Sequence, residues 1–157
     1  QVHRHLDVLL DGLAVALSGA AYVWTHPYEG GHHDHDSAAF LVQTLCDRLG
    51  PLAPTRLEFA SYHWNGSQRV AGAFFPQVDE TVVTLSLTGE RLARKQRALA
   101  AYVSQASVLR WFTPEVERYR PAPRYDFQRA PLKGCLYERK RWPVTHGAWA
   151  ESLKRVS

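Results

Sequence analysis

A short apolar run at residues 20–24, Ala-Ala-Tyr-Val-Trp, constrains the fold more than any other feature of the sequence. It lies between two segments with helical periodicity, the first of which spans residues 2–17 and is closed by Ser18-Gly19. The run is rich in β-forming residues and bounded by Gly19 and Pro27, as a buried parallel strand would be. The order helix, strand, helix predicts an α/β fold with a parallel sheet flanked by helices.

The rest of the chain continues with further helix and strand patterns. Gly50-Pro51 and Pro114 are stop signals for helices, Thr88 is a good helix cap, and Asn65-Gly66 predicts a turn between two strands. The elements we expect are a helix at 36–49, strands at 57–64, 70–75 and 81–87, a helix at 88–111 and, in an irregular tail from about 114, a short helix at 149–156.

Size and composition indicate one ordinary globular domain over residues 1–157, because 45% of the residues are hydrophobic and 22% are charged. Two cysteines are too few for a disulfide framework, so we expect a cytoplasmic, reducing location. No stretch approaches the roughly 20 apolar residues that span a bilayer, so we expect no membrane span. The sequence starts at Gln1 and contains no methionine, from which we expect a portion before Gln1 to be missing.

The formal net charge of +4 permits an electrostatic interaction with phosphates. However, the basic residues Arg91, Arg94, Lys95 and Arg97 have the spacing of the solvated face of a helix. A basic protein that binds nucleic acid or phosphate is therefore a distant alternative, and no nucleic-acid partner is expected.

Residues 25–36 contain four of the eight histidines, together with two aspartates and two glycines. Imidazole nitrogen and carboxylate oxygen are ligands that borderline cations such as Zn²⁺ accept. His32 and His35 are three residues apart at a helix start, so both rings can converge on one side, while Asp34 or Asp36 can orient an imidazole. A solvated polar loop and an adventitious metal-binding tract are the alternatives to a catalytic element.

The same residues, T-H-P-Y-E-G-G-H-H-D-H-D, resemble the second signature of the PIG-L/LmbE-like family, which is close to G-G-H-P-D-H. Residues 94–105 resemble the family's later K..AL…SQ helix, and residues 120–127, R-P-A-P-R-Y-D-F, resemble its C-terminal tail. This family comprises metal-dependent deacetylases of N-acetylated amino sugars. The resemblance implies a hydrolase with a Rossmann-like fold, built on a mostly parallel sheet flanked by helices, whose C-terminal portion is the present chain.

Carried over by position, the resemblance implies that His35 is the metal ligand of this motif. It implies that His32 stabilises the tetrahedral intermediate or protonates the leaving group, and Asp34 matches the motif's aspartate, to which we assign an orienting role. His33 stands where the family usually has proline. The family's first signature, a P-H-P-D-D run that supplies two further ligands and the general base, does not occur between Gln1 and Ser157.

The resulting hypothesis is a hydrolase that removes the acetyl group from an N-acetylated amino sugar or glycoconjugate, using Zn²⁺ or another divalent metal such as Fe, Co, Ni or Mn. Tyr28, Glu29 and His63 are the candidate substrate contacts, because the first two flank the motif and the third ends a predicted strand. The alternative is a non-catalytic carbohydrate-binding or structural relic of the same fold. A homo-oligomer is compatible with either.

Overall fold

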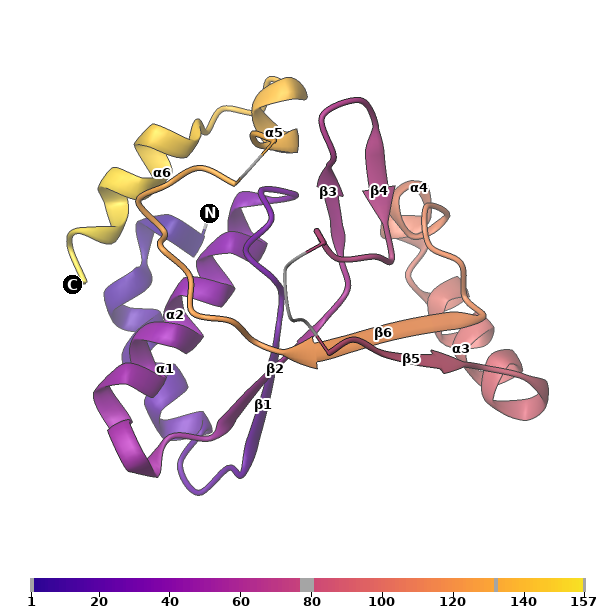
Figure 1. Ribbon diagram of the computed structural model, residues 1–157, viewed down its shortest axis with the longest axis horizontal. Coiled ribbons are helices and arrows are strands. Elements are labelled where there is room, and N and C mark those ends of the chain that lie inside the picture. Colours follow the sequence, from indigo (N-terminus) through magenta and orange to yellow (C-terminus); the bar gives the residue numbers. More distant parts are fainter. Residues whose placement is uncertain (1, 77–80, 132, 157) are drawn as a thin grey trace.

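The computed structural model describes residues 2–76, 81–131 and 133–156 and has a four-stranded sheet at its centre (Figure 1). The strand order is β1-β2-β6-β5. The first pair is parallel, whereas β2–β6 and β5–β6 are antiparallel. The α/β class is confirmed, and the sheet is mixed, so that the expected parallel character is shown only in part, by the β1–β2 pair. The strands are β1 (Tyr22–Thr25), β2 (Thr55–Phe59), β5 (Val83–Ser86) and β6 (Val116–Pro121).

Two helices on one side of the sheet form the core with a third from the C-terminal region (Figure 1). They are α1 (Leu6–Ala16), α2 (His33–Leu49) and α6 (His146–Leu153). In β1, side chains alternate between exposed and buried, so that Val23 packs against α2 while Trp24 faces the opposite way and is 51% exposed. One face of β1 therefore belongs to the core, and the other is left open.

Helix α2 begins three residues earlier than the sequence pattern predicts. Its N-cap is His32, whose imidazole accepts a hydrogen bond from the backbone N–H of Asp34. Histidine is an uncommon cap, and the ring replaces the hydroxyl or carboxylate oxygen that usually satisfies a free N–H group at a helix start. As a result, His33, Asp34 and His35 all lie in the first turn of the helix.

The strand predicted at residues 57–64 is two strands in different sheets. β2 ends at Phe59, and β3 (Tyr62–Trp64) pairs antiparallel with β4 (Arg69–Ala71) in a separate hairpin. The predicted turn at Asn65-Gly66 is confirmed, since the side-chain oxygen of Asn65 accepts the backbone N–H groups of Ser67 and Gln68. The break at residues 60–61 thus separates the hairpin from the main sheet.

The helix predicted at 88–111 is divided by Tyr102, whose backbone leaves helical geometry. It comprises α3 (Gly89–Ala101), the 3₁₀ turn η3 (Val103–Gln105) and α4 (Ala106–Leu109). The tail predicted to be irregular contains β6, a central strand, and α5 (Leu136–Arg139) before α6. The remaining short turns are η1 (Val2–Arg4) and η2 (Gly50–Leu52). Among the described residues, no helix is long and apolar enough to cross a bilayer.

Candidate functional site

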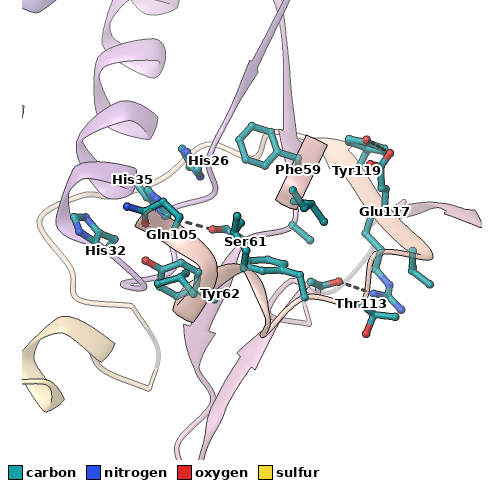
Figure 2. Close-up of a pocket in the computed structure, with 18 of the residues that line it drawn as sticks. His26, His32, His35, Phe59, Ser61, Tyr62, Gln105, Thr113, Glu117 and Tyr119 are labelled. Atoms are coloured by element: carbon teal, nitrogen blue, oxygen red, sulfur yellow. Dashed lines mark hydrogen bonds between the residues drawn. The ribbon is translucent and has the colours of Figure 1, made fainter. Parts of the chain in front are cut away.

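A pocket of about 940 Å³ lies between the open face of the main sheet and the α3–α4 segment. His26, His32 and His35 occupy one end, and Glu117 and Tyr119 lie at the other (Figure 2). Much of the wall between them is aromatic or aliphatic, so the pocket combines an apolar surface with a few polar groups, as small-molecule sites do. The apolar lining residues are Trp24, Phe59, Ala60, Tyr62, Leu99, Val108, Leu109, Phe112, Val116 and Trp142.

The rings of His26 and His35 are stacked, with centroids 3.7 Å apart and planes at 4° to each other. Burial lowers the pKa of His35 to about 2, and His26 and His32 add to that effect. Burial likewise lowers the pKa of His26 to about 4. Two stacked imidazoles cannot both carry a positive charge in such surroundings. Both rings are therefore neutral at physiological pH, which is the form that binds metals.

His35 extends from the first turn of α2 toward Ser61, in the break between β2 and β3 (Figure 2). The Oγ of Ser61 lies 3.3 Å from the Nδ1 of His35, and the ring of Tyr62 makes an edge contact with the imidazole at 5.3 Å. Since these contacts engage one nitrogen and one face of the ring, Nε2 is the atom left to bind a ligand. The hairpin and the helix together fix the direction of that atom.

The ring of His32 is fixed by its own helix cap. Its Nδ1 accepts the N–H of Asp34 at 3.0 Å, and Trp142 packs against the ring edge-on at 4.7 Å. A nitrogen that accepts a hydrogen bond carries no proton, so neutral His32 has its proton on Nε2. Burial, with a contribution from His33, lowers the pKa of His32 and favours this neutral form. His32 thus presents an N–H donor.

Asp34 is not part of the pocket lining. Its Oδ1 accepts the backbone N–H of Val2 and lies 3.0 Å from the Nδ1 of His33, whereas the nearest approach of its carboxylate to His32 is 3.9 Å. The carboxylate therefore orients His33, and it is the backbone N–H of Asp34 that orients His32. The structure thus contains the expected contact between an Asp34 carboxylate oxygen and an imidazole, and that imidazole belongs to His33.

The three candidate substrate contacts do not line the described pocket. Tyr28 is buried in the core, and its hydroxyl is 2.6 Å from the Nε2 of His146. Glu29 and His63 are only 2% exposed each, and their carboxylate oxygen and Nδ1 lie 3.0 Å apart. The structure thus brings Glu29 and His63 together, but in the interior and not in the lining of the pocket to which His32 and His35 belong.

A buried ion pair lies beside Glu29 and supports the loop between β1 and α2. The Nε of Arg120 donates to a carboxylate oxygen of Glu58 at 2.8 Å, and its Nη2 lies 3.7 Å from Glu29. Burial raises the pKa of Glu58 to about 7, against the opposing effect of Arg120. The hydroxyl of Tyr125 also donates to Glu58 at 2.8 Å. This network joins β2, β6 and the loop that leads into the histidine motif.

The end of the pocket opposite the histidines is charged. Lys95 and Glu117 form an ion pair at 3.0 Å, and the hydroxyl of Tyr119 donates to Glu117 at 2.6 Å. Arg118 is held by the carbonyl oxygen of Gly72. None of these residues was a candidate from the sequence, because they come from α3 and from a strand in the segment predicted to be irregular.

His26 and Trp142 were also not assigned a role in the site from the sequence. His26 belongs to the T-H-P start of the motif, so its position directly after a strand was an available signal. Trp142 lies 110 residues or so from the motif, and nothing local distinguishes it from a packing residue. Neither a known family model, nor a curated protein, nor a solved structure significantly matches the chain.

Proposed function

We propose that the chain belongs to a metal-dependent N-deacetylase that acts on an N-acetylated amino sugar, with its site at the histidine end of the pocket. The observation that carries this proposal is the grouping of His26, His32 and His35, whose rings burial holds neutral beside a largely apolar cavity. The resemblance of residues 25–36 to the PIG-L/LmbE-like signature supports it. So does the parallel β1–α2–β2 unit, which is compatible with a Rossmann-like origin.

The donors in this part of the pocket suit a borderline divalent cation such as Zn²⁺, for which neutral imidazole is a preferred ligand. In the proposal, the Nε2 of His35 is the ligand, and contact with Ser61 holds the ring in place. When bound, the metal polarises the acetyl carbonyl and lowers the pKa of a water molecule. His26 stacks on one face of the His35 ring and adds to the lowering of the pKa of His35, which favours the neutral, metal-binding form.

His32 is proposed to donate its Nε2–H to the oxygen of the acetyl group as negative charge develops there. A fixed N–H donor stabilises such an oxyanion, and removing one donor of this kind typically costs about 100- to 1,000-fold in rate. Its lowered pKa favours this role over protonation of the leaving amine, which needs an imidazolium. Trp142 limits rotation of the ring.

Among the described lining residues, Glu117 supplies the one carboxylate, and it is paired with Lys95 at the far end. No described carboxylate of the lining stands beside the histidines, so the pocket residues that the structure describes supply no carboxylate base at that end. A carbohydrate-binding protein without catalysis is therefore the second candidate. This candidate is favoured by the same aromatic wall, since sugar faces stack on aromatic rings.

Acetate release from N-acetylglucosamine and its glycosides, measured on the full-length protein with added Zn²⁺, tests the proposal. His35→Ala is expected to abolish release, whereas His5→Ala, at an exposed histidine of the same chain, is expected to leave it unchanged. Release that survives in His35→Ala contradicts the assignment of His35. Sugar binding without any release in the unaltered full-length protein supports the non-catalytic candidate instead.

A further inference from the structure

A second group of potential metal ligands lies outside the pocket, where the N-terminal turn meets the start of α2. His3, from η1, and His33 and Asp34, from the first turn of α2, have donor atoms that all lie within 4.8 Å of one another. Among the described residues, this is the one group of three or more His, Cys, Asp or Glu side chains that meets this criterion. None of the three lines the pocket.

The contacts within the group leave donors available. The rings of His3 and His33 meet edge-on, with centroids 5.5 Å apart and planes at 85°. The Nδ1 of His3 is buried and has no hydrogen-bond partner, which is costly for a polar atom. The Oδ1 of Asp34 is engaged by Val2 and His33, but its Oδ2 comes no closer than 3.9 Å to the nitrogen of His32.

We propose that His3, His33 and Asp34 bind a divalent cation of the Zn²⁺ type. Two imidazoles and one carboxylate are a common ligand set for such ions, and a fourth position remains for water. Metal–ligand bonds of about 2.0–2.2 Å in a tetrahedron place the donors roughly 3.4 Å apart. The three groups therefore need to approach one another by about 1 Å or a little more, a movement that rotation of the His3 side chain can supply.

The position of the site gives it a structural role that is independent of the proposed deacetylase. The bound ion joins η1 to the first turn of α2, reinforcing the hydrogen bond that Val2 already donates to Asp34. The negative charge of Asp34 offsets the positive end of the helix, which would otherwise disfavour a cation. The ring centroid of His32, a pocket residue, is 4.5 Å from that of His33, so a metal held by His33 also fixes the neighbour of His32.

The test is a calorimetric Zn²⁺ titration of the untagged, metal-free chain, accompanied by Co²⁺ absorption spectra. Replacing one of three ligands is expected to weaken binding at this site by about 100-fold or more, since even loss of a supporting contact costs 10- to 100-fold. His3→Ala and Asp34→Asn should both show this loss. His5→Ala, two residues along and exposed, should bind as the unaltered chain does.

The variant His35→Ala distinguishes Zn²⁺ binding at this site from Zn²⁺ binding in the pocket. We expect it to retain the Zn²⁺ binding that His3→Ala loses, together with the Co²⁺ bands of a low-symmetry site. The proposal is overturned if His3→Ala and Asp34→Asn bind Zn²⁺ as tightly as the unaltered chain, or if the binding disappears in His35→Ala instead. Circular dichroism of each variant establishes that it is folded, and His3→Gln replaces His3→Ala if the latter is not.

Discussion

Replacing Glu29 by alanine distinguishes a structural role for this residue from the substrate-binding role that its position in the motif suggests. One carboxylate oxygen accepts the backbone N–H of Phe75 at 2.7 Å, and the other lies 3.0 Å from the Nδ1 of His63. Glu29→Ala leaves both partners without their hydrogen bond in a region where Glu29 is only 2% exposed. We therefore expect a large loss of stability.

The magnitude follows from these contacts. Each buried group left unsatisfied costs about 1–3 kcal/mol, and Glu29→Ala leaves two such groups, the N–H of Phe75 and the ring nitrogen of His63. Arg120 keeps its bond to Glu58, so its charge remains compensated, and a loss of about 4 kcal/mol is expected. For a chain of this size, 1 kcal/mol corresponds to roughly 2–4 °C, so the melting temperature should fall by roughly 8–16 °C.

Urea denaturation followed by far-ultraviolet circular dichroism measures the effect. Glu151→Ala is the matched control, because Glu151 pairs with Lys154 on the surface, where both side chains are more than half exposed. Surface pairs contribute less than about 1 kcal/mol, so the control should unfold close to the unaltered chain. If Glu29→Ala also unfolds at the unaltered midpoint, the buried-network reasoning is wrong and a substrate contact becomes the better explanation.

Two further predictions concern the backbone near the motif and the titration of its histidines. Gly31→Ala should strongly destabilise the fold, because the new Cβ would lie 1.9 Å from the carbonyl oxygen of Tyr62. Gly12→Ala, which places its Cβ in open space within α1, should instead stabilise the fold by about 0.5–1 kcal/mol. Urea titrations of both variants measure these effects, and an unchanged midpoint in Gly31→Ala would contradict the prediction. The folded pKa values of His26 and His35 lie below 6.5, so their neutral forms stabilise the fold above pH 6.5 and this contribution is lost as the pH falls toward 4. The urea midpoint of the metal-free protein should therefore fall as the pH is lowered from 7 to 4, and it should fall less steeply in His26→Gln. Equal slopes in the unaltered protein and in His26→Gln would show that titration of His26 does not cause the decline.

The first part of the fold follows from local sequence patterns. Helical spacing of leucines and the short apolar run identify α1 and β1, and the helix between two strands accounts for their parallel pairing. The break at residues 60–61 cannot be predicted from the sequence, because L-E-F-A-S-Y-H-W is compatible with one continuous strand. The change of sheet depends instead on distant partners, such as the carbonyl oxygen of Arg118, which accepts the N–H of Ala60.

Strand β6 was missed for a related reason. Its sequence, V-E-R-Y-R-P, carries three charges and ends in proline, which favours an exposed or irregular segment. Arg120 is nevertheless almost wholly buried, because Glu58 lies opposite it in the adjacent strand. A charge is buried only when a partner is present, and a partner 62 residues away leaves no local pattern. Because β6 pairs antiparallel with both β2 and β5, two of the three strand pairs in the main sheet are antiparallel.

In the candidate site, the prediction that His32 and His35 face one side is confirmed, since both line the pocket. Their three-residue spacing in one helical turn is a local property, so the sequence suffices. The contacts that fix their rings, Ser61 and Trp142, come from a hairpin and from the C-terminal segment. The roles expected for the two histidines in catalysis stay predictions.

The open face of β1 and the α3–α4 segment have a thermodynamic consequence for any ligand. No residue of α3 or α4 is buried, although several of their apolar side chains line the pocket, so this wall remains hydrated in the free protein. A ligand that fills the cavity removes that surface from water, which lowers the heat capacity of the complex. Binding should therefore become more exothermic as temperature rises, and the size of that slope should increase with the apolar part of the ligand.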